Sequence, residues 1–232
     1  VAHRLGLRGA GAFDLAAACA GFVYALVMAD GFVRAQNRPA LVIAANLLSR
    51  RLDPMDRASV ALFADAAGAV LLTPSDEPGC GLLGVDLASD GAGYGLVHIE
   101  AGGSRKPFTQ AQDARETLMR IADGQGLYQQ AVTMMSASAR RALERAGLEP
   151  AQITRFAPHQ ANGRMTAMVA HQLGVAPEAI LSSIADYGNS SAATIPLTLS
   201  LAHAARPFAR GERLLVTAAG AGLTGGAAVI GF

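Results

Sequence analysis

Cys19 stands where a short apolar run, "GAFDLAAA", gives way to a helical pattern, and a thiol at such a junction could act as a nucleophile. The apolar positions that follow it recur with helical spacing, at Phe22, Leu26, Ala29 and Val33. Cys19 is therefore predicted near a helix N-terminus, where free N–H groups and the positive dipole end favour the thiolate. The alternative interpretation is that the cysteine is a small buried side chain in an alanine-rich run.

Two further polar side chains are predicted at the starts of helices. His159 follows a proline in "FAPHQANGRM", and Asn189 begins a helix in "DYGNSSAATIPLTL". Neutral N–H groups can hydrogen-bond an oxygen on which negative charge develops, and this stabilisation is largest in a dry site. An ionised aspartate at position 189 could not donate such a bond. The glycine-rich "AAGAGLTGG", taken alone, indicates a tight bend between two strands.

The hydrophobic pattern supplies elements to position these side chains. Residues 11–18 are predicted to form a buried strand, and residues 39–48 and 59–73 two core strands, the second with Asp65 and Gly68 marking a turn or bulge. Residues 76–126 are polar and rich in glycine. A clear amphipathic helix lies within residues 127–148 and is ended by Gly147. Strand, loop and helix then follow around His159. The C-terminal segment, residues 179–232, is predicted as strand, loop, helix, strand, glycine turn and strand.

The order of elements in residues 11–73 is repeated in the C-terminal segment. In each, a polar or reactive residue, Cys19 or Asn189, precedes a long helix that is followed by two core strands. A duplicated α/β unit with two-fold pseudosymmetry would bring both helix N-termini toward one point. We therefore predict two halves, residues 1–110 and 111–232.

Composition and charge exclude several classes of protein. The 232 residues are 51% hydrophobic, and 19 basic against 18 acidic residues give a formal charge of +1. This balance provides no long-range field for nucleic acid or anionic lipid. The two cysteines show neither metal-ligand spacing nor a disulfide framework, which favours a reducing compartment. With no signal peptide and no apolar run approaching the ~18 residues of a membrane span, we predict a cytoplasmic protein that binds no metal.

Five motifs together resemble one family of enzymes. They are "AFDLAAACAGFVYAL", "DPMDR", "PHQANGR", "YGNSSAATIPL" and "GAGLTGG". In this order the sequence resembles the condensing enzymes of the thiolase superfamily, most closely β-ketoacyl-acyl-carrier-protein synthase III. The resemblance implies an α/β fold of thiolase-like duplicated halves, with mixed sheets in α-β-α-β-α layers. It also implies a homodimer that uses acyl-coenzyme A and acyl carrier protein as substrates and needs no cofactor.

The resemblance also implies a role for each matching residue. Cys19 would be the acyl-accepting nucleophile, while His159 and Asn189 would promote decarboxylation of a malonyl thioester and stabilise the enolate. The backbone N–H groups of Cys19 and Ala221 would form the oxyanion hole. The positions expected to contact the substrate or its carrier are Arg57, Asn162, Arg164, Gly220 and Gly222.

The sequence departs from the family pattern at its start. Family members carry an additional αβ segment, on the order of 90 residues, ahead of "VAHRLG". We therefore expect the first half to be incomplete, with an unpaired sheet edge or an apolar surface left open beside residues 11–18. Two alternatives share the same three residues: a type III polyketide synthase and a starter-unit acyltransferase. A non-catalytic subunit of a condensing pair would be expected to lack the cysteine.

Overall fold

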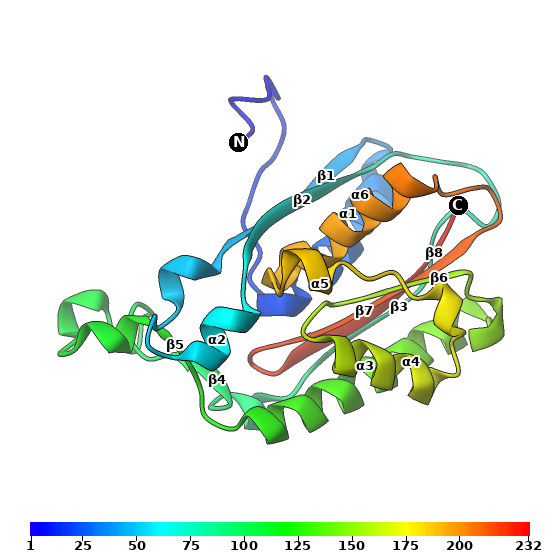
Figure 1. Ribbon diagram of the computed structural model, residues 1–232. Coiled ribbons are helices and arrows are strands. Elements are labelled where there is room, and N and C mark those ends of the chain that lie inside the picture. The colour runs from blue at the N-terminus through cyan, green and yellow to red at the C-terminus, as the bar shows by residue number, and fades with distance from the viewer.

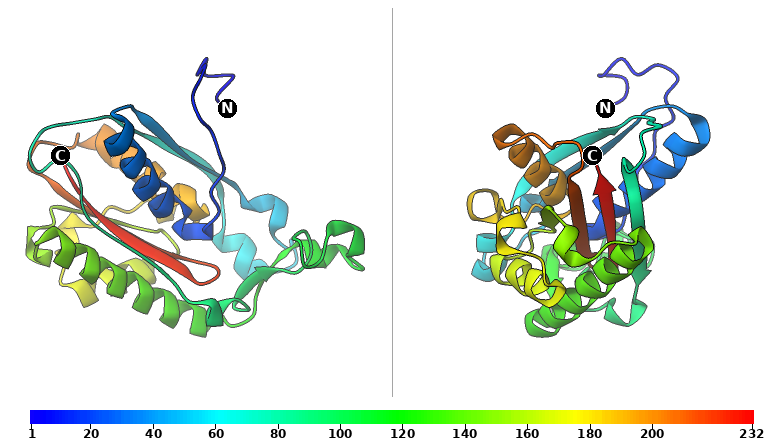
Figure 2. Two further views of the ribbon diagram at one scale, coloured as in Figure 1. Left: turned by 180° about the vertical axis from the view of Figure 1, so that it is seen from behind. Right: turned by 90° about the vertical axis from the view of Figure 1, so that its right-hand side faces the viewer.

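Two sheets and two layers of helices alternate through the molecule (Figure 1). The computed structural model describes residues 1–232, apart from the side chain of Ala58. Helices α3 (Gly124–Ala146) and α4 (Gly163–Leu173) cover the outer face of a central sheet. Helices α1 (Gly21–Gln36) and α6 (Thr194–Ala205) lie on its other face, beneath a second, two-stranded sheet (Figure 2). This α-β-α-β order agrees with four of the five predicted layers.

The central sheet has four strands in the order β3-β8-β7-β6. Their bounds are β3 Gly81–Ser89, β6 Arg155–Pro158, β7 Arg213–Gly220 and β8 Thr224–Gly231. β6 runs parallel to β7, whereas β8 is antiparallel to both β7 and β3, so the sheet is mixed as predicted. β7 is buried along nearly its whole length because helices pack on both faces of the sheet.

The predicted order of a helix followed by two strands is present in both segments, while the division into halves 1–110 and 111–232 stays a prediction. α1 is followed by the antiparallel pair β1 (Ala40–Leu47) and β2 (Asp65–Leu72), just as α6 is followed by β7 and β8. The two helices join one apolar core, to which Phe22, Val23 and Ile195 contribute fully buried side chains. Figure 1 shows the N-terminal ends of both helices close to the same end of the central sheet.

The outer face of the β1–β2 sheet is apolar and open. Leu41 and Leu71 are paired across the two strands, and 41% and 65% of their respective surfaces are exposed. Ile43 and Leu47 follow on the same face of β1 and are also exposed. The first half thus has an open apolar surface, whereas its expected position beside residues 11–18 stays a prediction.

Several predicted elements differ from the structure. Residues 11–18 do not form a strand. A 3-10 turn begins at Ala18, and most side chains of the segment are exposed. The predicted strand 59–73 is divided into helix α2 (Arg57–Leu62) and β2, so that Asp65 begins the strand. Gly68 is not a bulge: a Cβ there would lie 2.8 Å from Leu197 N, so glycine lets α6 pack directly on β2. Strand β3 lies within the polar, glycine-rich residues 76–126, where no strand is predicted.

Shorter elements complete the chain. β4 (Val97–Ile99) and β5 (Met119–Ile121) pair at the base of a projecting arm, seen in green in Figure 1, and α5 (Ile184–Tyr187) precedes Asn189. The predicted strand near Ile180 is reduced to one bridge with Phe156. The 3-10 turns are Ala18–Ala20, Leu48–Arg51, Gly91–Gly93, Phe108–Gln110, Ala114–Thr117, Pro150–Gln152, Pro177–Ala179 and Ser191–Ala193.

Helix α1, with the turn before it, corrects the expectation that no apolar run approaches the length of a membrane span. Over Ala18–Gln36 the chain is helical and apolar enough to cross a membrane by length and composition alone. In the structure the helix packs Phe22, Val23 and Leu26 into the core between the two sheets.

Candidate active site

Cys19 lies in a 3-10 turn, Ala18–Ala20, that leads directly into α1. The preceding Ala18 has φ of 46°, a left-handed conformation that is strained for a residue with a Cβ. Gly220, at the end of β7, packs against this turn: a Cβ there would lie 2.6 Å from Cys19 N. Cys19 therefore occupies the predicted position at the start of a helix, and only glycine at position 220 permits the close approach.

The turn between β7 and β8 is bound to the cysteine turn. The Thr224 hydroxyl donates to the carbonyl oxygen of Ala17 at 2.9 Å and lies 3.3 Å from that of Ala221. Leu223 and Asp90 exchange two backbone hydrogen bonds, of 2.7 and 2.9 Å. These contacts fix the segment containing Ala221 beside the backbone of Cys19.

Asn189 is held by both its backbone and its side chain. Its N–H donates to Leu62 O and its carbonyl accepts from Ala64 N, each at 2.9 Å. Its side-chain oxygen accepts a 2.9 Å bond from Ser191 N. With that oxygen occupied, the buried amide presents its Nδ2 group as a donor.

His159 is buried at the end of β6. Its backbone N–H donates to Thr217 O at 2.8 Å, and its ring Nδ1 lies 2.7 Å from Thr194 Oγ1. Burial lowers the pKa of the imidazole to about 4, so the ring is neutral near pH 7. A neutral ring has one N–H group and can serve as a hydrogen-bond donor from one nitrogen only.

The thiol of Cys19 differs from the sequence-based expectation. Burial raises its pKa above the ordinary value, although part of the residue surface stays accessible. A hydrogen bond from the Ser191 hydroxyl, 3.4 Å from the sulfur, lowers the pKa but offsets only part of this effect. The prediction of a depressed pKa is therefore wrong for this site, because desolvation of the thiolate outweighs the stabilising contacts.

One short segment, residues 189–194, connects the three predicted site residues. Ser191 contacts Cys19 through its hydroxyl and Asn189 through its N–H, and Thr194 contacts His159. The two helix starts thus meet, as the repeat predicts. Within the repeat, however, Cys19 corresponds to Ala192, since both are central in the 3-10 turn before their helix.

Sequence reasoning missed three residues that build the site: Ser191, Thr194 and Thr224. The first two belong to the quoted "YGNSSAATIPL" motif, but hydroxyl side chains at a helix start are also ordinary capping residues. Their contacts with Cys19 and His159 cross 172 and 35 residues of sequence, so local patterns carry no sign of them.

Two of the remaining predicted contact residues, Asn162 and Arg164, line a surface depression. Asn162 and Arg164, at the start of α4, border an open depression of about 860 Å³ together with Tyr128 and Gly163. The Asn162 side chain also caps α4 by accepting a 2.8 Å bond from Met165 N. Arg57 is exposed at the first position of α2 and does not border this depression.

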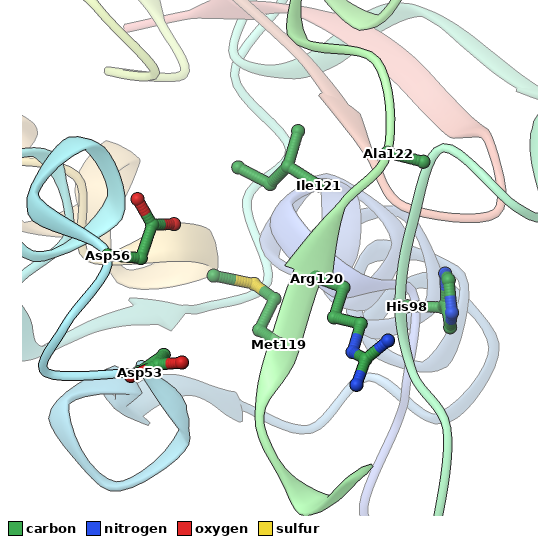
Figure 3. Close-up of a pocket in the computed structure, with 7 residues that line it drawn as sticks. All are labelled: Asp53, Asp56, His98, Met119, Arg120, Ile121 and Ala122. Carbon is green, nitrogen blue, oxygen red and sulfur yellow. The ribbon is translucent and has the colours of Figure 1, made fainter. Parts of the chain in front are cut away.

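A second cavity, of about 410 Å³, lies between the segment preceding Arg57 and the β4–β5 pair (Figure 3). Met119 and Ile121 extend from β5 toward Asp53 and Asp56, whereas Arg120 points to the other side of the strand. The full lining is Asp53, Asp56, His98, Met119, Arg120, Ile121 and Ala122. Among the residues whose side chains are described, no group of three or more His, Cys, Asp or Glu could hold a metal ion.

The fold and the sequence both match known proteins. A family model described as 3-oxoacyl-[acyl-carrier-protein (ACP)] synthase III matches residues 13–91, and one described as the C terminal of that synthase matches residues 143–232. The crystal structure of 3-oxoacyl-(acyl carrier protein) synthase III from Pseudomonas aeruginosa PAO1 superposes with a TM-score of 0.91 at 40% identity. The match covers 100% of this chain and 70% of that one.

Curated relatives give the same result. A 3-oxopimeloyl-[acyl-carrier-protein] synthase from Brucella abortus is 50% identical over 228 residues, or 98% of this chain and 69% of the relative. One from Rhodothermus marinus is 51% identical over 232 residues, or 99% of this chain and 66% of the relative. The chain thus spans about two thirds of the length of these relatives.

These matches define the class as the thiolase-like condensing enzymes, which are acyltransferases. Within that class, the chain belongs to the 3-oxoacyl-acyl-carrier-protein synthase III family.

Proposed function

We propose that this chain carries the active site for a decarboxylative Claisen condensation through an acyl-cysteine intermediate. The observation that supports this best is the convergence of Cys19, His159 and Asn189 on the buried segment 189–194. A nucleophile and two neutral donors in a dry site match the needs of acyl transfer followed by enolate formation.

In the first half-reaction, the Cys19 sulfur attacks the carbonyl carbon of an acyl-coenzyme A. The backbone N–H groups of Cys19 and Ala221 stabilise the oxyanion, a role supported by the contact of Gly220 with the cysteine turn. The C–S bond to coenzyme A then breaks, and the departing thiolate takes the proton that the cysteine thiol loses. The raised pKa of Cys19 means that this proton stays on the thiol until substrate arrives.

In the second half-reaction, a malonyl thioester on the carrier protein loses CO₂. The electron pair of the broken C–C bond passes into the thioester as an enolate, whose oxygen accepts bonds from the His159 ring and Asn189 Nδ2. The enolate carbon attacks the acyl-cysteine carbonyl, and the Cys19 thiolate leaves and is reprotonated. The product is a 3-oxoacyl thioester on the carrier.

The names of two relatives suggest a more specific product. A 3-oxopimeloyl thioester corresponds, by reversing the condensation, to a five-carbon dicarboxylic starter and one malonyl extender. The higher identity to the two 3-oxopimeloyl synthases, 50% and 51%, than to a Pseudomonas aeruginosa β-ketoacyl synthase III, 43%, favours a glutaryl starter over acetyl. Initiation of fatty acid or polyketide synthesis with a monocarboxylic starter is the second candidate.

We further propose a cytoplasmic homodimer with acyl carrier protein as partner and coenzyme A thioesters as substrates. Arg164, exposed beside the depression at α4, is the proposed contact for an acidic carrier, and Arg57 for coenzyme A. Arg164→Glu should then weaken the use of carrier-bound substrates more than that of coenzyme A substrates. Added salt should reproduce this defect.

The direct test is an assay of the full-length enzyme with radiolabelled glutaryl- or acetyl-coenzyme A and malonyl-carrier protein. A carrier-bound 3-oxoacyl product supports the proposal, and the preferred starter separates the two candidates. A product released from the carrier or carried on coenzyme A would favour a polyketide synthase instead. The absence of both acyl transfer and decarboxylation would favour a non-catalytic subunit.

His159→Ala and Asn189→Ala provide an internal check of the roles. Each variant should lose ~100-fold or more in malonyl decarboxylation, because one oxyanion donor is removed, while Cys19 can still be acylated. Unchanged decarboxylation in either variant contradicts the assigned roles.

A further inference from the structure

The ring of His159 has one side-chain hydrogen-bond partner among the residues described, the Thr194 hydroxyl. Both residues are at least 98% buried, and the Nδ1–Oγ1 distance is 2.7 Å. The same hydroxyl oxygen lies 3.3 Å from Gln160 N and 2.9 Å from Ser191 O. A hydroxyl has one proton, so it can donate either to the ring or to the Ser191 carbonyl but not to both.

The choice between these two arrangements decides the tautomer of the neutral ring. If the hydroxyl donates to Ser191 O, Nδ1 must carry the ring proton, and Nε2 becomes an acceptor that would repel an enolate oxygen. If the hydroxyl donates to Nδ1, the ring proton is on Nε2, which then becomes a donor.

Two observations favour donation to the ring. Ser191 O already accepts the backbone N–H of Thr194, so it keeps a partner when the hydroxyl turns away. The 2.7 Å distance lies at the short end of the range for N–H donors, which are most often about 2.9–3.0 Å from the acceptor. The Gln160 N–H points at the same oxygen as a donor and is compatible with this arrangement.

We propose that Thr194 is a positioning residue that donates its hydroxyl proton to Nδ1 of His159 and thereby holds the ring in the Nε2-protonated tautomer. The inference rests on the proposed function, in which Nε2–H donates to the thioester oxygen. Thr194 itself need not touch the substrate. Its contribution is to make the donor available before the malonyl group arrives.

The test is ¹⁵N NMR of the full-length protein labelled in its histidine rings. The signals of His159 are identified by their absence from the spectrum of His159→Gln. In wild type these signals should show a pyrrole-like Nε2 and a pyridine-like Nδ1. Thr194→Val, which keeps the shape but lacks the hydroxyl, should move these signals toward the other tautomer. Thr194→Ser should restore the wild-type pattern. Thr198→Val is the matched control, because it removes a buried hydroxyl one turn along α6 that bonds Thr194 O and Ser183 rather than the ring.

The kinetic readout separates positioning from a general loss of structure. Thr194→Val should slow malonyl decarboxylation by between about tenfold and 100-fold, while acylation of Cys19 stays within about twofold of wild type. Thr194→Ser should recover most of the decarboxylation rate. Equal losses in both half-reactions would mean that Thr194 is merely structural.

Several outcomes would overturn the inference. The proposal is wrong if the wild-type ring is protonated at Nδ1, or if Thr194→Val keeps the wild-type tautomer. If Thr194→Val does not fold, the wild-type spectrum and Thr194→Ala decide the matter by the same criteria. A tautomer that depends on Thr194 in a protein without condensing activity would support the positioning role and contradict only the proposed function.

Discussion

At the scale of single residues, burial has a larger effect on the site than charge. The ionised forms of both Cys19 and His159 are disfavoured because little solvent or opposite charge stabilises them. The result is a neutral thiol and a neutral imidazole near pH 7. This suits a reaction whose negative charge resides on the substrate, where fixed N–H donors stabilise it.

A pH dependence of stability follows from His159. Its pKa is about 4 in the folded protein, below the unfolded value of about 6.5, so the unfolded state binds more protons between these values. The stability from the buried neutral ring is complete above pH 6.5 and is lost as pH falls toward 4, by up to about 3 kcal/mol.

Chemical denaturation of wild type and His159→Gln between pH 4 and 7 measures this effect. The difference in free energy of unfolding between the two proteins should shrink as the pH falls. Carboxylates and exposed histidines titrate in both proteins and cancel in the comparison. Parallel curves over the whole range would show that the folded state does not depress the pKa of His159.

At the scale of elements, the site depends on the approach of the β7–β8 turn to the start of α1. Gly220→Ala would place a Cβ 2.6 Å from Cys19 N and 3.0 Å from Ala20 N, so one of the two backbone segments must move. We expect acylation of Cys19 to fall by at least tenfold, since a displacement of the oxyanion donors is costly (roughly 100-fold for one lost donor).

Gly31→Ala is the matched control for this substitution. Gly31 is an exposed position within α1, and a Cβ there meets nothing within 4 Å. The change should leave acylation unaltered and stabilise the protein by roughly 0.5–1 kcal/mol through helix propensity. Wild-type acylation in Gly220→Ala, measured by stopped-flow release of coenzyme A, would argue against the close approach.

The elements differ in how well the sequence predicts them, because some have local signals and others depend on distant contacts. The helix from Gly124 to Ala146 has a repeating apolar stripe and a terminal Gly147, both local signals, and it was predicted within a few residues. Strand β3 is not predicted from the sequence because Asp86 interrupts its apolar pattern. That side chain is buried through ion pairs with Arg141 and Arg145, at 2.8 and 3.0 Å, more than 50 residues away.

Short apolar runs are ambiguous for a different reason. The segment before Asp65 is apolar enough for a strand, yet residues 57–62 are helical and turn the chain so that Leu62 and Ala64 bind the backbone of Asn189. Periodicity over so few residues cannot separate the two structures. For the site, the sequence predicts Cys19, His159 and Asn189. It does not predict the hydroxyl groups that orient them, because those contacts are tertiary.

At the scale of the whole molecule, the open β1–β2 face is the apolar surface that we expect to promote self-association. Exposed Leu41, Ile43, Leu47 and Leu71 form a continuous apolar surface on a two-stranded sheet. Surfaces of this kind promote association of soluble proteins. We expect the 232-residue chain, expressed alone, to self-associate.

Paired substitution on this face tests the expectation. Ile43→Lys with Leu71→Glu should reduce light scattering and shift the chain toward monomer in size-exclusion chromatography, because the charges lie on the open face. Arg38→Glu with Asp76→Lys exchanges charges at exposed positions outside the two strands and serves as a control. A monodisperse wild-type chain would show that this face does not drive association.

The central claim is that Cys19 accepts the acyl group, and peptide-mapping mass spectrometry tests it most directly. The full-length enzyme is incubated with acyl-coenzyme A without extender, quenched in acid and digested. One acyl group is expected on the peptide containing Cys19, present in His159→Ala and Asn189→Ala and absent in Cys19→Ala. An adduct on Cys80, or one that persists in Cys19→Ala, would contradict the assignment of the nucleophile.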